Sequence, residues 1–454
     1  MLGKDKVSSI VGYALSHSKA DQTEVVLSSY HSYLTRFANS QIHQNVAEHN
    51  SLLSVRVIIG KKIGVSSTNS LDKKSIEKTL QRALEIAKHQ KENTDFVSLP
   101  KAAKRVYRDV KTYFKSTAEF NEIQRKDRVK EMIEIVKEKG LRAFGSFTTG
   151  ISETAVANSL GVFAYNIATD AYSNVVAIGK DSSGYAQDSS RDVKKVDTRR
   201  IAERAASKAI LGKDPIELPP GNYPVLLEPL ASAELIHFLG WLGMGAKAFY
   251  EGRSFMSGKL GEKVTSDSIT IYDDAYDKRG FAFPFDFEGV PKKRVLLIEE
   301  GIAQGVVYDS LTAFKHKRKS TGHALPAPNP YGPIPLNLIL SPGESEWEEM
   351  VKSTDKGILI TRFHYTNSVD QKKTIITGMT RDGTFLVEKG EITKGIKNLR
   401  FTQSILEALS EVSMIEDRLT LIGGGAGYEG RFATGVLAPG LKIEKFTFSG
   451  KTTF

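Results

Sequence analysis

The hydrophobic pattern of the first ~210 residues predicts the same order of elements twice. In each unit, apolar positions at helical spacing precede alternating apolar and polar segments, and a second amphipathic helix follows. The first unit is predicted to contain a helix over 7–18, strands over 24–30, 33–37 and 53–59, a hairpin turn at Gly60, and a helix with Ile76, Leu80, Ala83, Leu84 and Ala87 on one face. The second is predicted to contain a helix over 118–139 ended by Gly140, strands over 143–148, 153–157, 162–169 and 173–178, and a helix over 198–211 with Asp197 as its N-cap.

The tripeptide Ala-Asn-Ser occupies the same relative place in both units, at 38–40 and at 157–159. A repeat this short can arise by coincidence. The matching order of helices and strands is the stronger observation, and it favours an N-terminal α+β domain built by duplication.

A segment rich in proline and glycine, Pro215–Gly221, cannot continue the preceding helix and marks a domain boundary. We therefore expect an N-terminal domain over 1–214 and a C-terminal domain over 222–454. The second domain is predicted to be mostly β, with helices over 231–245 and 402–411, strands over 223–228, 269–272, 294–299, 357–363, 373–379, 384–388, 419–422 and 443–448, and turns at 381–383 and 388–390. The predicted fold class is α+β, with a duplicated N-terminal domain followed by a mostly-β C-terminal domain.

Composition excludes several kinds of chemistry. The chain of 454 residues contains no cysteine, so disulfides, thiolate nucleophiles and cysteine-ligated zinc are excluded. No window approaches the ~20 consecutive apolar residues of a membrane-spanning helix. The first seven residues, MLGKDKV, begin no signal peptide, so we expect a cytoplasmic protein without membrane contacts.

The net charge of +10 raises the question of nucleic-acid binding. The basic residues are dispersed, however, and short clusters such as 291–294 and 315–319 accompany no recognisable nucleic-acid-binding motif. The charge therefore favours a well-solvated surface, and nucleic acid is not the expected partner.

The apolar helix predicted over 231–245 carries a single histidine, His237. A zinc-protease helix needs two histidines that converge on one metal and a glutamate that polarises the bound water. Glu234 lies three residues before His237, on the same helix face. Glu-x-x-His pairs of this kind bind metals in helix bundles, where several helices each supply metal ligands. In a helix this apolar, a histidine more often makes one internal hydrogen bond and has a structural role.

Several stretches of the chain resemble the TldD/PmbA family, a group of zinc peptidases first noticed as modulators of DNA gyrase. In chain order they are TRFAN at 35–39, IHQ at 42–44, GRSF at 252–255, SGKLG at 257–261, FDFEG at 285–289, VLLIEEG at 295–301, STG at 320–322, TRF at 361–363, GMTRDGTF at 378–385 and VEKGE at 387–391. Together they cover nearly the whole chain in family order. The resemblance implies an N-terminal α+β domain and a β-rich C-terminal domain, in agreement with the hydrophobic pattern.

The resemblance also implies where a zinc site would lie. Active TldD-type members carry HExxxH in the apolar helix and a cysteine near the C-terminus. Counting back from GRSF places His237 on the first histidine, Phe238 on the glutamate and Leu242 on the second histidine, and the cysteine falls at Ala426. A zinc ion needs three protein ligands and an activated water. Only His237 keeps the family residue, so no metal is expected in this chain, whereas a TldD-type partner would carry zinc.

Other histidines offer a less ordered ligand group. The group consists of His316, His323 and His364, and the first two lie seven residues apart in a basic segment that contains glycine, which is typical of a loop. Their spacing favours no shared ligand face.

Three further patterns resemble binding sites. Asp273, Asp274 and Asp277 offer oxygen ligands for Mg²⁺ or Ca²⁺ but do not follow the EF-hand spacing, so turn or surface roles are favoured. Residues 425–430 match GxGxxG, but no helix is predicted after them, which excludes a dinucleotide site. The proline-rich segment 320–330 fits either a surface loop or an extended backbone that lines a peptide channel.

The first functional hypothesis is a non-catalytic, PmbA/TldE-like subunit of a peptide-degrading metallopeptidase complex. It would pair with a TldD-type chain as a heterodimer, or with itself as a homodimer, and would help to bind peptide or unfolded-protein substrates. We expect His237, Arg253, His323 and Arg362 to face the peptide cleft, and we assign no catalytic residue.

Two other hypotheses remain. One is an active metallopeptidase with a divergent zinc site, in which His237 joins other histidines or a carboxylate and Glu234 acts as base. Phe238 argues against it, because a phenyl group cannot polarise water. The other is a basic DNA- or gyrase-associated binding protein, which predicts a steep salt dependence of DNA binding.

Overall fold

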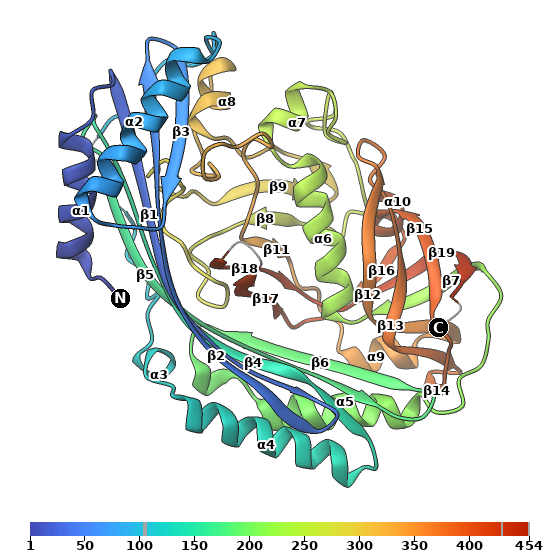
Figure 1. The fold of residues 1–454 in the computed structure, drawn as a ribbon. Coiled ribbons are helices and arrows are strands. Elements are labelled where there is room, and N and C mark those ends of the chain that lie inside the picture. Colours follow the sequence, from blue (N-terminus) through green and yellow to red (C-terminus); the bar gives the residue numbers. More distant parts are fainter. Residues whose placement is uncertain (103–106, 428–429, 453–454) are drawn as a thin grey trace.

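The N-terminal half is built around one long antiparallel sheet (Figure 1). The computed structural model describes residues 1–102, 107–427 and 430–452. The strands of this sheet are β1 (Gln22–Ala38), β2 (Gln41–Ile59), β3 (Lys62–Thr68), β4 (Arg142–Asn158), β5 (Phe163–Ile178) and β6 (Ser183–Ser190). They follow the order β3-β2-β1-β4-β5-β6, so the two units join where β1 pairs with β4. The predicted α+β class and the repeated order of elements are confirmed.

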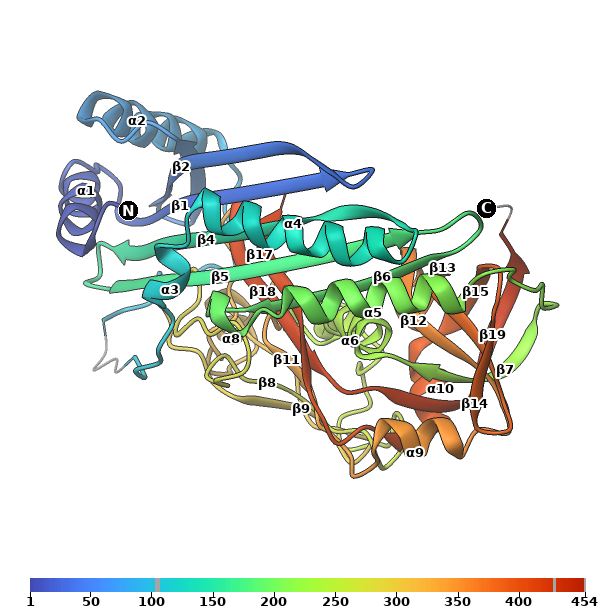
Figure 2. The ribbon, with the colours of Figure 1, turned by 90° about the horizontal axis from the view of Figure 1, so that it is seen from below.

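Helices cover one face of this sheet, and the other face is turned towards the C-terminal domain (Figures 1 and 2). The helices of this half are α1 (Lys4–Ser16), α2 (Lys73–His89), α3 (Lys115–Ala118), α4 (Glu122–Glu138) and α5 (Thr198–Leu211), with a 3₁₀ turn at Val193–Lys195. Asp197 caps α5 as predicted, because its side chain accepts a hydrogen bond from the backbone N–H of Arg200. The helix predicted over 118–139 is interrupted, since Asn121 forms a capping box that begins α4.

The helix-covered face contains two separate hydrophobic cores. One lies under α1 and α2 and includes Leu27 of β1. The other lies under α4 and α5 and includes Phe37, at the far end of the same strand. Between them, the positions of β1 on this face are Ser29, His31, Tyr33 and Thr35. The duplication therefore leaves a polar seam between its two units.

Several strands are longer than the hydrophobic pattern predicts. The segments expected at 24–30 and 33–37 form the single strand β1, those at 143–148 and 153–157 form β4, and those at 162–169 and 173–178 form β5. The expected breaks are wrong because they rest on polar residues that interrupt the alternation. Backbone pairing on both sides of β1 and β4 continues through these residues.

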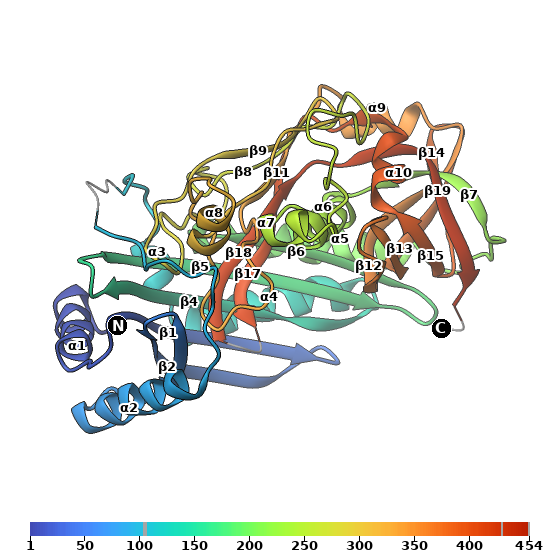
Figure 3. The ribbon, with the colours of Figure 1, turned by 90° about the horizontal axis from the view of Figure 1, so that it is seen from above.

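The C-terminal half contains two sheets with a helix between them (Figure 3). One sheet has the order β10-β9-β8-β11-β18-β17, and the other has the order β12-β7-β19-β15-β13-β14, with β16 on β19 and a direct β12–β13 pairing. The strands are β7 (Gly221–Leu227), β8 (Ile271–Asp273), β9 (Val295–Glu299), β10 (Ile302–Ala303), β11 (Leu338–Leu340), β12 (Lys356–Asp370), β13 (Ile375–Glu388), β14 (Glu391–Gly395), β15 (Leu399–Ser404), β16 (Val412–Ile415), β17 (Thr420–Gly427), β18 (Gly430–Ala438) and β19 (Leu441–Lys451). The helices are α6 (Pro229–Gly243), α7 (Ala246–Tyr250), α8 (Ser310–Lys315), α9 (Trp347–Lys352) and α10 (Ile405–Ser410).

Two local expectations in this domain are wrong. The helix predicted over 402–411 is the end of β15 followed by α10, because Ser404 caps the helix only after β15 has paired with β13 and β19. The turn predicted at 381–383 lies inside β13 as a bulge, where Asp382 and Gly383 have φ of 52° and 132°. The turn expected at 388–390 is confirmed between β13 and β14.

Buried ion pairs connect the two halves of the chain. Arg56 of β2 contacts Glu24 of β1 at 2.7 Å and Glu288 of the C-terminal half at 3.1 Å. Arg431 of β18 pairs with Asp170 of β5, and the side chains are only 1% and 2% exposed. None of the helices in the described ranges has both the length and the apolar character that a membrane-spanning helix needs.

Candidate functional site

The helix α6 is the centre of the candidate site. Pro229 stands in its first turn, where the missing N–H costs nothing. Its residues Leu235, Ile236 and Leu239 are buried in the core between the two C-terminal sheets. Gly240 permits this packing, because a Cβ there would lie 2.5 Å from Leu338 Cδ1. The core therefore fixes which face of α6 remains accessible.

That accessible face is aromatic. His237 is exposed, Phe238 is half-buried and Trp241 is 46% exposed. The ring of Phe238 meets those of His237 and Trp241 edge to face, with centroids 6.2 Å apart in both pairs. In the described part of the chain His237 makes no hydrogen bond, so the structural role of an internally bonded histidine does not fit it. Crowding by surrounding protein lowers the pKa of His237, which favours a neutral ring at neutral pH.

The other positions of the family motif lie apart from His237. Leu242 is 3% exposed and belongs to the hydrophobic core. Ala426 pairs with Arg431 in the β17–β18 hairpin, and its side chain lies outside the described part of the structure. Phe238 supplies no oxygen or nitrogen atom. Of the motif positions whose side chains are described, His237 alone could ligate a metal.

A charged group lies beside α6 at the junction of the two halves. Arg362 of β12 donates from Nε to Asp382 Oδ2 at 3.0 Å. Its guanidinium lies over the ring of Tyr185 of β6, 4.1 Å from the ring centroid. Asp382 also accepts from Ser183 Oγ at 2.6 Å. Burial raises the pKa of Glu234 on α6, and Thr366 and Arg362 oppose this shift. Arg362 therefore lies close enough to influence the charge of α6.

Arg253 lies at the opposite end of this helix. It donates from Nη1 to Gln371 Oε1 at 2.9 Å, and Gln371 in turn donates to the carbonyl of Leu242 at 2.6 Å. Arg253 thereby connects the loop after α7 to the β12–β13 hairpin and to the end of α6. His237, Arg362 and Arg253 thus lie on or beside one helix.

His323 lies elsewhere, in a fully buried network. Its Nε2 is 2.9 Å from Asp273 Oδ1, and its Nδ1 is 2.9 Å from Thr321 Oγ1. Burial lowers the pKa of His323, and the nearby Lys292 adds to this effect. Its side chain has no exposed surface, so this imidazole reaches no cleft in the present arrangement.

The remaining histidines are also occupied in other ways. His316 stacks on Tyr250 with ring centroids 3.3 Å apart, and His364 packs against Tyr365 at 4.2 Å. Within the described ranges, no three His, Asp or Glu side chains are grouped closely enough to hold a metal ion.

The remaining candidate segments have local roles. Asp274 and Asp277 accept hydrogen bonds from backbone N–H groups two residues later, as the turn interpretation predicts. That interpretation is wrong for Asp273, which lies fully buried in β8 against His323. The strand β18 begins at Gly430, the last residue of the GxGxxG segment, and residues 428–429 lie outside the described part. A strand in place of the required helix confirms the exclusion of a dinucleotide site. In the segment 320–330, the backbone carbonyls of Thr321 and Ala324 already accept hydrogen bonds from Lys293 and Phe287.

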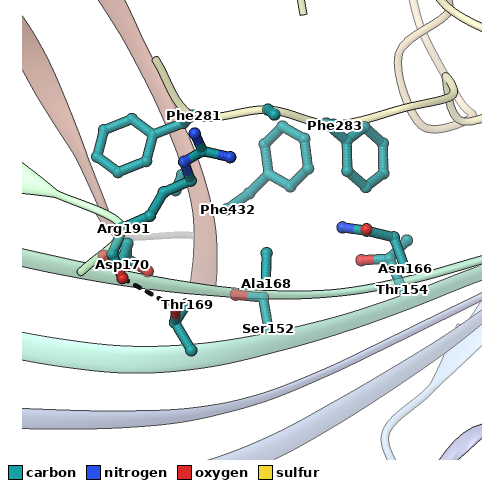
Figure 4. A pocket seen from close by; sticks show the side chains of 12 residues that line it. Ser152, Thr154, Asn166, Ala168, Thr169, Asp170, Arg191, Phe281, Phe283 and Phe432 are labelled. Atoms are coloured by element: carbon teal, nitrogen blue, oxygen red, sulfur yellow. Dashed lines mark hydrogen bonds between the residues drawn. The ribbon is translucent and has the colours of Figure 1, made fainter. Parts of the chain in front are cut away.

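Sequence reasoning missed a small pocket between the two halves (Figure 4). Rings of Phe281, Phe283 and Phe432 lie on one side of it, and Thr154 and Asn166 lie on the other. Its cavity volume of about 20 Å³ accommodates about one water molecule. The aromatic run in 281–287 was a visible signal, but the polar wall comes from β4 and β5, far away in the sequence.

Family models match the chain over three consecutive ranges. They describe the PmbA/TldA metallopeptidase domain 1 at 23–87, its central domain at 115–212 and its C-terminal domain at 220–450. A metalloprotease TldD homolog of Haemophilus influenzae is 30% identical over 256 residues, which is 55% of this chain and 53% of that protein. The chain spans about half the length of this and the next curated relatives. A metalloprotease PmbA homolog of the same organism is 24% identical, with 80% of each protein covered.

Solved structures share the fold. TldE from Thermococcus kodakarensis superposes with a TM-score of 0.86 at 21% identity, covering 98% of this chain and all of that one. A Thermotoga maritima protein described as a candidate modulator of a DNA gyrase gives the same TM-score and coverage at 22% identity. Because the model of the C-terminal domain alone covers half of the sequence, the chain belongs to the PmbA/TldA (TldD/PmbA) metallopeptidase family.

Proposed function

We propose that this chain is the non-catalytic, PmbA/TldE-like subunit of a peptide-degrading metallopeptidase complex. The observation that carries the proposal is the composition of α6. Phe238 stands where a general base is needed, and Leu242 is buried in the core where a second ligand is needed. A single imidazole cannot hold a zinc ion, and no side chain at the position of the base can activate a water bound to it.

The partner in this proposal is a TldD-type chain that carries the zinc, and the complex would act in the cytoplasm. Relatives named TldD and relatives named PmbA or TldE both match this chain, which supports such a pairing. A homodimer is the other possible assembly. This chain would contribute a wall of the peptide cleft rather than a catalytic group.

The aromatic face of α6 supports a role in binding peptides. His237, Phe238 and Trp241 offer flat apolar surface and one neutral imidazole, which suits extended chains with apolar side chains. Arg362 and Arg253 frame the same helix, and both are held by hydrogen bonds to other side chains. They would contact peptide carbonyl or carboxylate groups.

An active metallopeptidase with a divergent site is the competing function. It requires His237 to share a metal with His316, His323, His364 or a carboxylate. His323 is buried against Asp273, and His316 is stacked on Tyr250. Either side chain would have to leave its present partners before it could act as a ligand.

The decisive experiment measures peptide hydrolysis by this chain alone, by a TldD-type chain alone and by their mixture. We expect hydrolysis only when the TldD-type chain is present, faster in the mixture, and abolished by a chelator. Trp241→Ala is expected to raise the KM of the mixture for apolar peptides, whereas Ile123→Ala, an exposed position on α4, leaves it unchanged. Metal-dependent hydrolysis by this chain alone that is lost in His237→Ala would overturn the proposal.

A further inference from the structure

The first half of β2 is an uncovered sheet edge. The strand β3 pairs with β2 only from Leu53 to Ile59. Within the described ranges, no strand pairs with the outer side of the preceding part of β2, from Gln41 to Leu52. Most side chains of this part are exposed. Figures 2 and 3 both show β2 running along the rim of the molecule, so another chain could reach this edge.

Hydrogen bonds show which backbone groups of β2 face outwards. The carbonyl of Asn50 accepts from Ser29 Oγ of β1 at 3.3 Å, so it points towards β1. The next N–H, that of Ser51, donates at 2.8 Å to the Asn50 side chain and not to β1. Backbone groups of successive residues point to opposite sides of a strand. The N–H and C=O groups of Ala47 and His49 therefore face outwards, as those of Ser51 do.

Side chains on this edge lean back over β1 instead of covering the open backbone. Asn45 Oδ1 accepts from Thr35 Oγ1 of β1 at 2.6 Å. Glu48 Oε1 accepts from the hydroxyl of Tyr30, also on β1, at 2.6 Å. These bonds hold both side chains towards β1, so the backbone between them stays accessible for pairing.

The edge also lacks the charges that commonly prevent pairing. Natural sheet edges are often protected by lysine, by proline or by inward-pointing charges. In a chain with 63 Lys and Arg residues, the segment 41–52 contains no Lys, Arg or Pro, and Glu48 is its only carboxylate. A bulge opposite Arg36 and Phe37 ends the regular edge at Gln44. An edge with so little charge can meet an identical edge without strong repulsion.

We propose that the edge Gln44–Asn50 pairs antiparallel with the same edge of a second copy of this chain, so that the two N-terminal sheets become continuous. A two-fold axis at Ala47 makes the pairing self-complementary. It opposes the following residues: Gln44 and Asn50, Asn45 and His49, Val46 and Glu48. No like charges are opposed in this register, whereas an axis at Glu48 would oppose two carboxylates.

A second copy fits this edge better than a free peptide does. Both edges are already held extended by their own sheets, so their pairing avoids the conformational entropy that a free peptide would lose. So short a pairing buries less surface than a stable dimer needs, and we expect a reversible dimer with a Kd of about 1–100 μM. The pairing uses neither α6 nor a metal, so it is independent of the function proposed above.

Sedimentation velocity of the full chain, between about 1 and 200 μM, tests the pairing. The parent chain should shift reversibly from monomer to dimer as its concentration rises. Ala47→Pro removes an outward N–H and keeps the bonds to β1, because the neighbouring residues make those bonds. This variant should remain a monomer at every concentration. Ala47→Thr keeps the N–H and is the control, which should dimerise as the parent chain does.

Hydrogen exchange of the parent chain gives a second readout, which decides the question should Ala47→Pro fail to fold. Residues 44–50 should exchange more slowly in concentrated than in dilute solution, whereas residues 73–89 of α2 should exchange equally in both. A parent chain that stays monomeric throughout, or a dimer that a folded Ala47→Pro leaves intact, overturns the pairing. Protection of residues 44–50 only by an added unstructured peptide would also overturn it and would assign the edge to peptides.

Discussion

Arg431 and Asp170 show how one residue pair connects distant parts of the chain. Arg431 Nε donates to Asp170 Oδ1 at 2.8 Å, and its Nη1 donates to Ser32 Oγ at 2.9 Å. Two glycines make room for the pair. A Cβ on Gly150 would lie 1.9 Å from Arg431 Nε, and one on Gly425 would lie 2.5 Å from Asp170 Oδ1. The guanidinium is therefore held by β1, β5 and the close approach of β4.

Replacing one member of this pair should be costly. Asp170→Asn leaves a buried guanidinium without its counter-charge, and we expect a loss of about 3–5 kcal/mol in the free energy of unfolding. Guanidinium chloride denaturation measures it. Glu85→Gln, in an exposed pair with Lys88, is the control and should change stability by less than about 0.5 kcal/mol. Equal losses in the two variants would contradict the argument.

At the scale of elements, the bulge in β13 decides where Arg362 lies. The register between β12 and β13 shifts between Ile360 and Arg362, opposite Asp382 and Gly383. The shift brings the Asp382 carboxylate to Arg362 Nε. A regular strand would carry one residue fewer here, and Arg362 would lose this partner.

The bulge requires glycine at position 383. Its φ of 132° is outside the range of other residues, and a Cβ would lie 2.4 Å from Thr361 Oγ1. Gly383→Ala is expected to lower stability by about 1–3 kcal/mol. Gly12→Ala in α1, where a Cβ meets no atom within 4 Å, should instead raise stability by up to about 1 kcal/mol. Thermal melts compare the melting temperatures of the two variants. An unchanged melting temperature for Gly383→Ala would contradict the argument that the backbone at position 383 requires glycine.

At the scale of the whole molecule, a shared arginine joins the halves of the chain. Arg56 contacts two glutamates. Glu24 belongs to the N-terminal sheet, and Glu288 belongs to the FDFEG segment of the C-terminal half. Two buried carboxylates around one guanidinium carry an excess negative charge. Burial, with Glu288 nearby, raises the pKa of Glu24 to about 7 even though Arg56 opposes the shift.

This pKa makes stability depend on pH in a defined direction. The folded chain holds a proton on Glu24 that the unfolded chain releases near pH 4.5. The contribution is therefore complete below about pH 4.5 and is lost as pH rises through about 7. Between about pH 5.5 and 7.5, we expect the parent chain to lose about 1–2 kcal/mol relative to Glu24→Gln. Urea denaturation at both pH values checks this, with Glu131→Gln, an exposed acid, as control. Parallel pH profiles for the parent chain and Glu24→Gln would disprove it.

The sequence predicted which helices and strands form better than it predicted the residues at which they begin and end. Alternation and helical spacing located the two repeated units, because local burial patterns record them directly. They could not show that β1 continues through His31 and Ser32, since that continuity depends on backbone pairing with β2 and β4. The same polar interval, which includes His31, interrupts the alternation and forms the seam between the two units.

The candidate site was predictable only in part. The family resemblance placed His237, Phe238 and Leu242 on one helix, and α6 carries all of them. The partners of Arg362 and the burial of His323 depend on contacts between remote segments, which single-sequence patterns do not record. Asp382, for example, looked like part of a turn and proved to be an ion-pair partner inside a strand.

The place where the two repeated units meet has a consequence for synthesis. The first unit ends with α2 at His89, and β4 ends about 70 residues later. At about 5–20 residues per second, the nascent chain spends several seconds with the long edge of β1 unpaired. An open edge of this length invites pairing with other chains. On the ribosome, the polar interval in the middle of β1 would act as a guard against aggregation.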